Sequence, residues 1–155
     1  MSRLHTITSL QDPLIRLVED DPVRPEIPAS FRVSETSEIF VLQHSDSFEP
    51  EAVVCVAYRD STPADILELA REPEGMVNTA VFYTIWSYKP GAGRRLIDQA
   101  VCSIRARWDS ITEFVTLSPQ TEMARQFHLG NGAREWRRNS DTVNYLYGSR
   151  QNSAS

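Results

Sequence analysis

The sequence predicts a mixed α/β (α+β) fold, and three observations support this. Two apolar runs, Glu38–Gln43 and Ala52–Arg59, are joined by a polar loop and predict an antiparallel hairpin. The run Thr79–Ser87 predicts another strand, and it leads into Gly93–Trp108, where apolar residues recur at helical spacing. A strand over Ile111–Leu117 then continues an alternation of strands and helices.

Shorter elements complete the prediction. Helices are expected over Pro13–Asp20, Ser61–Arg71 and about Pro119–Leu129, an extended connector over Pro22–Pro28, and strands over Ala133–Arg137 and Thr142–Tyr147. We expect a single domain over residues 1–150, in which 1–34 form an N-terminal helix and connector. The small polar residues of 148–155 predict a flexible tail.

The composition excludes several classes of protein. With 41% hydrophobic and 24% charged residues in a chain of 155, the sequence is too apolar for a disordered protein. No run approaches the roughly 20 apolar residues that a membrane span needs, and the N-terminus lacks a secretory h-region. The net charge of −5 argues against generic nucleic-acid binding, which needs a concentrated cationic surface. We therefore expect a cytoplasmic protein with no membrane or nucleic-acid partner.

The cysteines and two of the histidines suggest no special chemistry. Cys55 and Cys102 form no CxxC motif or disulfide framework, so reduced, buried thiols are expected. His5 and His44 have no partners at metal-ligand spacing, and we predict no metal site.

A glycine-containing turn follows the strand Thr79–Ser87. Gly91 and Gly93 allow the backbone to approach a ligand closely, and the first N–H groups of the next helix have no partner inside it. A pyrophosphate can accept those bonds, assisted by Arg94 and Arg95. Taken alone, the glycine pair is equally typical of a plain strand-to-helix turn.

With its helix, this segment resembles the GNAT superfamily of acyl-CoA-dependent acyltransferases. Their signature is Gln/Arg-x-x-Gly-x-Gly/Ala, and the window here is Tyr88-Lys-Pro-Gly91-Ala-Gly93, with Tyr88 in place of Gln or Arg. The resemblance implies that the amides of Gly91, Ala92, Gly93, Arg94 and Arg95 bind the CoA pyrophosphate. It also implies that backbone groups of Phe82, Thr84 and Trp86 pair with the pantetheine arm.

A second landmark of that superfamily is Asn-x-x-Ala-x-x-x-Tyr-x-x-x-Gly-Phe. Its spacing is kept in a window from Thr121 to Ala133, in which His128 replaces the Tyr that in many members protonates the departing CoA thiolate. Imidazole, with an unperturbed pKa of about 6.5, can exchange a proton near neutral pH. The alternative is a structural histidine.

The last third of the chain is similar to the GNAT-like C-terminal domain of malonyl-CoA decarboxylase. The matching pieces are LSP (Leu117–Pro119), FHLGNGA (Phe127–Ala133) and VNYLY (Val143–Tyr147). The resemblance implies that Ser118 and His128 form the pair that protonates or stabilises the enolate left when malonyl-CoA loses CO₂. The sequence PQTEM departs from the PIPGF usual after the Ser, and the insertion between the two motifs is missing.

Each of the other candidate residues has more than one interpretation. Ser118 is a catalytic hydroxyl or an ordinary helix start, and Asn131 binds the ligand or supports a left-handed turn. Tyr145 and Tyr147 lie on one face of the last strand, where each could belong to the core, line a pocket or supply a catalytic hydroxyl. Tyr145 joins Ser118 and His128 as a candidate catalytic residue. Trp86 lines a pocket or belongs to the core.

These features lead to three hypotheses. The first is an N-acyltransferase using acetyl-CoA or another acyl-CoA, in which an amine acceptor of unknown identity attacks the thioester directly. Residues 79–87 contain no carboxylate to act as a base, and Glu38, Glu51 and Glu113 are unranked candidates. The second is decarboxylation of malonyl-CoA or a related acyl-CoA by Ser118 and His128. The third is a non-catalytic binding module; a homodimer is compatible with each.

Overall fold

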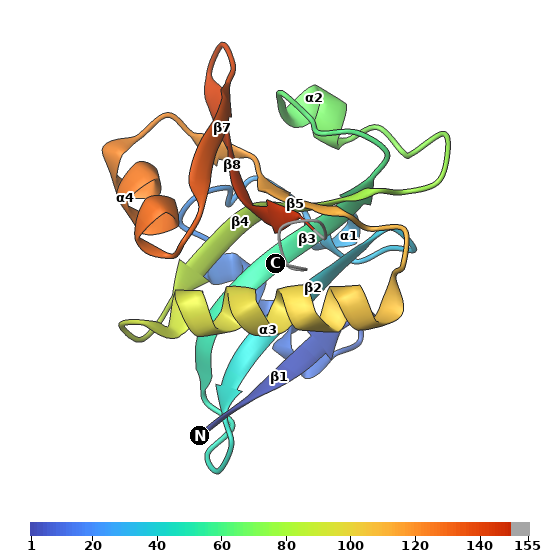
Figure 1. Ribbon diagram of the computed structural model, residues 1–155. Coiled ribbons are helices and arrows are strands. Elements are labelled where there is room, and N and C mark those ends of the chain that lie inside the picture. The colour runs from blue at the N-terminus through green and yellow to red at the C-terminus, as the bar shows by residue number, and fades with distance from the viewer. Residues whose placement is uncertain (150–155) are drawn as a thin grey trace. The chain divides into compact units, whose positions relative to one another are not determined.

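A computed structural model describes residues 1–149 (Figure 1). The chain divides into two compact units, Met1–Val56 with Thr84–Ser103, and Ala57–Tyr83 with the chain from Ile104 onward. Strands β3 (Pro50–Arg59) and β4 (Thr79–Ser87) and the long helix α3 (Ala92–Arg107) contribute residues to both.

The remaining elements lie within one unit each. Those of the first are β1 (Ser2–Ile7), the 3-10 helix η1 (Pro13–Asp20), α1 (Ala29–Arg32) and β2 (Ser37–His44). Those of the second are α2 (Ile66–Leu69), β5 (Glu113–Thr116), β6 (Ser118–Pro119), α4 (Glu122–Gly130), β7 (Arg134–Arg138) and β8 (Thr142–Ser149).

The strands form an eight-stranded sheet in the order β1-β2-β3-β4-β5-β8-β6, and β7 pairs with β8. β4 and β5 run parallel, whereas β1–β2, β5–β8, β6–β8 and β7–β8 are antiparallel. β2 and β3 are buried along almost their whole length, as their runs of β-branched and aromatic residues predict. The mixed α/β class expected from the sequence is confirmed.

Two helices are shorter than predicted, for reasons that lie in β8. The helix expected over Ser61–Arg71 reduces to α2, because side chains of β8 bond the carbonyls just before it: Asn144 Nδ2 to Pro63 O (3.0 Å) and Thr142 Oγ1 to Ala64 O (2.6 Å). The helix expected from Pro119 begins at Glu122, because Ser118 and Pro119 form β6 and pair with β8.

Both ends of the described chain also differ from prediction. β1, which pairs with β2 along its whole length, was not expected within residues 1–34. The tail predicted over 148–155 is wrong for Gly148 and Ser149, which continue β8 and pair with β5; residues 150–155 lie outside the described part. Cys55 is buried as predicted, but Cys102 is exposed, and both are free thiols.

Candidate functional site

The glycine turn joins β4 to α3, as the sequence predicts. Gly91 has a φ of +78°, a left-handed conformation that L side chains rarely adopt. The guanidinium of Arg95 lies over it, with Nη1 3.7 Å from the position that a Cβ of Gly91 would occupy. Ala92 N donates to Lys89 O (3.2 Å) and closes the turn. The first turn of α3 thus begins directly beside an arginine side chain.

A buried carboxylate on β3 contacts this turn. Glu51 Oε1 accepts a hydrogen bond from Ser2 Oγ (2.5 Å) and lies 3.6 Å from Arg95 Nη2, while Oε2 lies 3.6 Å from Lys89 Nζ. The bond from Ser2, together with the two cations, keeps the pKa of Glu51 below its ordinary value although burial opposes this. Glu51 is therefore ionised at neutral pH.

Tyr88 stands where the GNAT signature has Gln or Arg, and its hydroxyl bonds two other residues of the first unit. Its hydroxyl donates to Asp20 Oδ2 (2.7 Å) and accepts a bond from Trp86 Nε1 (3.0 Å). Burial, and then the Asp20 carboxylate, raise the pKa of the Tyr88 phenol to about 12. Tyr88 is thus a neutral hydrogen-bonding group that ties the end of β4 to η1.

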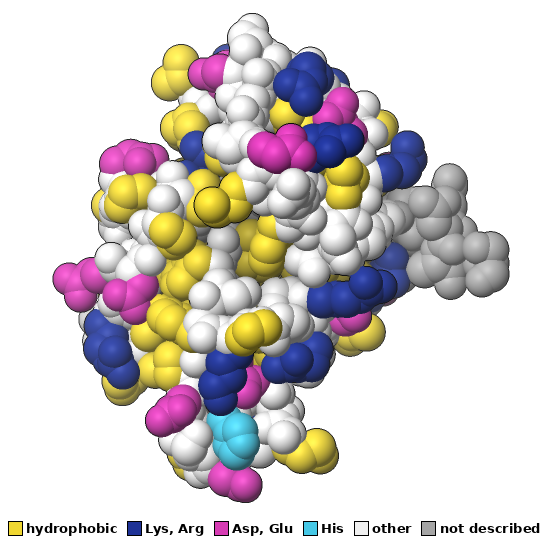
Figure 2. Space-filling model, turned by 90° about the vertical axis from the view of Figure 1, so that its left-hand side faces the viewer, with side chains coloured by type: hydrophobic (Ala, Val, Ile, Leu, Met, Phe, Trp, Pro, Cys, Tyr) yellow, Lys and Arg dark blue, Asp and Glu magenta, His cyan; other side chains and the backbone are white. Residues whose placement is uncertain are grey.

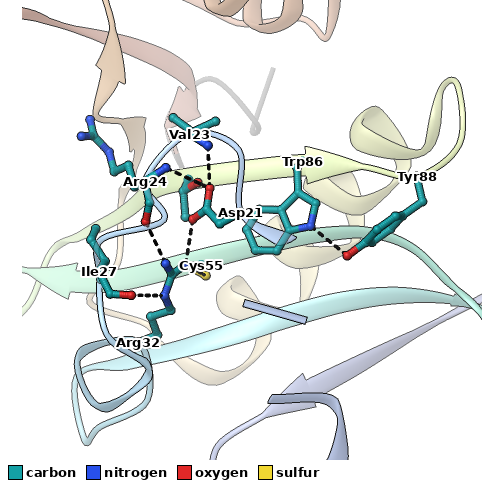
Figure 3. A network of polar contacts seen from close by, with 9 residues as sticks. Asp21, Val23, Arg24, Ile27, Arg32, Cys55, Trp86 and Tyr88 are labelled. Carbon is teal, nitrogen blue, oxygen red and sulfur yellow. Dashed lines mark hydrogen bonds and ion pairs between the residues drawn. The ribbon is translucent and has the colours of Figure 1, made fainter. Parts of the chain in front are cut away.

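A buried ion pair lies next to this end of β4 (Figure 3). Arg32 Nη1 donates to Asp21 Oδ2 at 2.8 Å, and both side chains are almost completely inaccessible. Asp21 Oδ1 accepts bonds from Thr84 Oγ1 (2.8 Å) and from the amides of Val23 and Arg24 (2.8 and 3.0 Å). The segment between η1 and α1 is thereby fastened to β4 at Thr84.

The three β4 residues assigned to the pantetheine arm are all buried. The parallel ladder with β5 ends at the pair Phe82–Thr116, although β4 continues to Ser87. Thr84 bonds to Asp21 and Trp86 to Tyr88, while the Phe82 ring contacts the rings of Phe114 (6.4 Å between centroids) and Tyr147 (6.2 Å). Their side chains are therefore engaged within the protein, so a ligand would meet β4 through its backbone.

His128 is the centre of an aromatic cluster in the second unit. It lies on α4, which packs beside the β7–β8 hairpin (Figure 1). Its Nδ1 is 2.7 Å from the hydroxyl oxygen of Tyr147, and its ring stacks on Tyr145 at 5.1 Å. Phe127 meets the imidazole edge-on at 5.2 Å. Tyr145 and Tyr147 do share a face of β8, and Tyr147, not Tyr145, bonds the imidazole.

Burial changes the chemistry expected of His128. The side chain is 4% exposed, and desolvation lowers its pKa to about 4. The imidazole is therefore neutral at neutral pH, so the protonated form that could donate a proton is scarcely populated. Its Nε2 has no hydrogen-bond partner among the described residues.

Ser118 and His128 are both buried in the second unit, but no hydrogen bond joins them within the described residues. Ser118 Oγ donates instead to Thr116 Oγ1 (2.7 Å), which accepts a further bond from Tyr145 N (3.1 Å). In this conformation Ser118 stabilises the junction of β5, β6 and β8.

Asn131 ends α4, where its amide donates to Phe127 O (3.1 Å) and His128 O (3.2 Å). Its φ is −95°, and Gly132 adopts the left-handed conformation with a φ of +98°, so the left-handed turn expected at Asn131 is wrong. The Nδ2 atom of Asn131 is buried and has no hydrogen-bond partner in the described part of the chain.

Within residues 1–149, no three His, Cys, Asp or Glu side chains are grouped so that they could hold a metal ion. No helix in that part of the chain is long and apolar enough to cross a membrane. His5 pairs with Asp12 at 2.7 Å, and His44 Nδ1 accepts bonds from the amides of Asp46 and Ser47.

The sequence interpretation missed the polar partners in these sites. Asp21 and Arg32 were not singled out, although two consecutive aspartates before a proline-rich segment are a signal for a capped, hydrogen-bonded turn. Glu51 was considered only as a base, and Tyr147 was weighed without its bond to His128. Glu38 is buried in β2 and Glu113 lies in β5.

The chain shares its fold with solved structures of malonyl-CoA decarboxylase and of GNAT acetyltransferases. Malonyl-CoA decarboxylase from Agrobacterium vitis matches 99% of this chain and 62% of its own, with a TM-score of 0.77 and 22% identity. A Bacillus subtilis acetyltransferase in complex with CoA matches 96% of this chain and 99% of its own (TM-score 0.63, 13% identity). A GNAT family acetyltransferase from Elizabethkingia anophelis with acetyl-CoA bound matches 94% of both chains (TM-score 0.58, 10% identity).

These identities establish a shared fold. This chain spans 57–62% of the length of the malonyl-CoA decarboxylase chains that it matches. No protein-family model and no curated protein sequence matches it.

Proposed function

We propose that this protein binds a CoA thioester and transfers its acyl group to an amine. The observation that carries the proposal is the 2.7 Å hydrogen bond between His128 and the Tyr147 hydroxyl, because it positions a phenolic hydroxyl beside a buried imidazole. The glycine turn between β4 and α3 supplies the features that a pyrophosphate requires. The acceptor amine and the acyl group are left open.

The turn residues fit CoA in their chemistry. The amides from Gly91 to Arg95 include the first N–H groups of a sixteen-residue helix, which attract an anion. Gly91 presents no side chain there, and Arg95 lies over it with a guanidinium that binds phosphate oxygens well. When bound, CoA supplies the activated acyl group and a thiolate leaving group.

In this mechanism the amine attacks the thioester carbonyl, the C–N bond forms and the C–S bond breaks. Tyr147 then gives its proton to the departing thiolate, because a phenol (ordinary pKa about 10) and a thiol (about 8.5) are close enough in pKa to exchange a proton. The acylated nitrogen loses its extra proton to water, and the Tyr147 phenolate regains a proton from water, so the step balances. His128, which is neutral, holds the Tyr147 hydroxyl in place. This role replaces the direct protonation by His128 expected from the sequence.

Decarboxylation of malonyl-CoA or a related acyl-CoA is the second candidate, and a specific observation favours it. His128 is neutral and its Nε2 has no partner among the described residues. If Tyr147 donates to Nδ1, the ring proton lies on Nε2. A neutral imidazole N–H can stabilise the enolate that forms when the C–C bond to CO₂ breaks. The resemblance of the LSP and FHLGNGA segments to malonyl-CoA decarboxylase supports the same reaction.

One experiment separates the candidates. The purified protein is incubated with acetyl-CoA and with malonyl-CoA, with and without a panel of amines, and the products are identified by mass spectrometry. Acyl transfer predicts free CoA and an acylated amine that depend on the added amine. Decarboxylation predicts conversion of malonyl-CoA to acetyl-CoA without any amine. Binding without either product would contradict both reactions and leave a non-catalytic binding module.

A further inference from the structure

Glu51 is a buried negative charge among the positive charges of the glycine turn. It is 4% exposed, whereas Lys89 and Arg95, its two ion-pair partners, have side chains that are 46% and 49% exposed. Its backbone carbonyl also accepts a bond from Tyr88 N (2.8 Å). Both the main chain and the side chain of Glu51 therefore contact residues of the turn.

The charges around the turn give a simple sum. The window from Tyr88 to Arg95, YKPGAGRR, contains Lys89, Arg94 and Arg95 and no carboxylate, so its formal charge is +3. Glu51 reduces this to +2. Figure 2 shows one face of the molecule, on which Lys and Arg side chains are interspersed with carboxylates. The diester pyrophosphate of CoA carries two negative charges, fewer than inorganic tripolyphosphate carries at neutral pH.

We infer that Glu51 is a specificity-determining residue of the turn: its charge limits the attraction for anions, so that a diester pyrophosphate is accepted and more highly charged phosphates are disfavoured. The inference rests on the proposed binding of CoA at the turn. It assigns to Glu51 a role other than that of a catalytic base.

The geometry explains why Glu51 repels a bound anion while its partners can bind one. The contacts of Glu51 with Lys89 and Arg95 are 3.6 Å long, beyond the usual hydrogen-bond range, so both cations can turn towards a ligand at little cost. Glu51 cannot move away, because Ser2 bonds it and the protein surrounds it. A fixed like charge beside a binding site is a recognised source of specificity.

The test compares Glu51→Gln, which removes the charge but keeps the shape and an oxygen that can accept from Ser2, with the control Ser2→Ala, which removes the hydrogen bond to Glu51 without changing the charge. Calorimetry measures the Kd for CoA, inorganic pyrophosphate and tripolyphosphate at two salt concentrations. We expect Glu51→Gln to bind CoA roughly tenfold more tightly, as removal of one nearby charge implies. The gain should be larger for tripolyphosphate and should shrink at high salt. Ser2→Ala should stay within about twofold of wild type.

A double variant, Glu51→Gln with Lys89→Gln, restores the sum of +2 and should return the affinity for CoA to near the wild-type value. It also removes both members of an ion pair, so it remains informative if the single variant does not fold. Unchanged or weaker CoA binding by folded Glu51→Gln, or a double variant that stays tenfold tighter, would overturn the inference. A wild type that binds pyrophosphate but not CoA would instead contradict the proposed function, and the pyrophosphate comparison would still test Glu51.

Discussion

The Nδ1 atom of His128 on α4 lies 2.7 Å from the hydroxyl oxygen of Tyr147 on β8, and Tyr145, two residues before Tyr147, stacks on the same imidazole. One tyrosine therefore contacts the histidine through its hydroxyl and the other through its ring face. This arrangement assigns the proton donor of the proposed reaction to Tyr147 and a packing role to Tyr145.

Replacement of Tyr147 by Phe removes that hydroxyl and keeps the ring. We expect turnover to fall by about a hundredfold or more, in the range typical of a lost general acid, with the Kd for CoA unchanged within about twofold. Steady-state kinetics and calorimetry measure the two quantities. The matched control, Tyr145→Phe, keeps its stacking on His128 and should retain most of the activity. Loss of activity in the control but not in Tyr147→Phe would reverse the two roles.

The buried His128 predicts a pH dependence of stability. Its pKa is about 4 in the folded protein, against 6.5 as the ordinary value, so the unfolded chain binds more protons between these two values. The free energy of unfolding should therefore fall as the pH decreases from 6.5 towards 4. The shift corresponds to roughly 3.5 kcal/mol at most, at about 1.4 kcal/mol per pKa unit. Urea denaturation at several pH values measures it.

The control for that experiment is His128→Gln, which cannot titrate in this range. Its stability at pH 7 will differ from the wild type because hydrogen bonding and packing change. The informative quantity is the slope of stability against pH, which should be shallower in the variant. Equal slopes in the two proteins would show that other groups cause the acid sensitivity.

Gly91 is needed for the conformation of the turn. An alanine there must adopt a φ of +78°, at a cost of roughly 1–2 kcal/mol, and its Cβ would meet Arg95 Nη1 at 3.7 Å. We expect Gly91→Ala to lower the free energy of unfolding by about 1 kcal/mol and to weaken CoA binding severalfold. Gly75 is the matched control, because its Cβ position is open and its φ is not in the left-handed region. Equal CoA affinity in both variants would argue against a ligand at the turn.

The ion pair between Asp21 and Arg32 should contribute strongly to folding. Asp21→Asn leaves the buried guanidinium without its countercharge, and such a change typically costs about 3–5 kcal/mol. Chemical denaturation followed by circular dichroism measures the loss. Glu135→Gln breaks the exposed pair with Arg138 (3.2 Å) and should cost less than about 1 kcal/mol. If both variants lost a similar free energy of unfolding, burial would not be the reason that the pair of Asp21 and Arg32 stabilises the fold.

The sequence predicted those parts of the fold whose signals are local. Thr79–Ser87 is a strand in the structure with the same bounds, because its β-branched and aromatic residues favour no other conformation. Helix α3 follows from the period of its apolar residues. The helix expected over Ser61–Arg71 failed because its first residues are bonded by Asn144 and Thr142, about eighty positions further along the chain. Contacts between residues so far apart leave no periodic pattern in the sequence.

The site was predicted by position but not by chemistry. The motif spacing singled out His128, and strand alternation placed Tyr145 and Tyr147 on one face. The register that brings Tyr147 to Nδ1, and the burial that lowers the pKa of His128, depend on tertiary packing. The bond from Thr84 to Asp21 spans 63 positions and was equally invisible. A glycine turn can be predicted from sequence because the left-handed φ that it requires depends on a single residue.

The central claim is that the turn between β4 and α3 binds the pyrophosphate of a CoA thioester. Calorimetric titration of the wild type and of Gly91→Ala with CoA tests it most directly, with pantetheine, which lacks the pyrophosphate, as the second ligand. The account predicts saturable binding of CoA by the wild type, severalfold weaker binding by the variant, and much weaker binding of pantetheine by both. No binding of CoA by the folded wild type, or equal affinities for CoA and pantetheine, would contradict it.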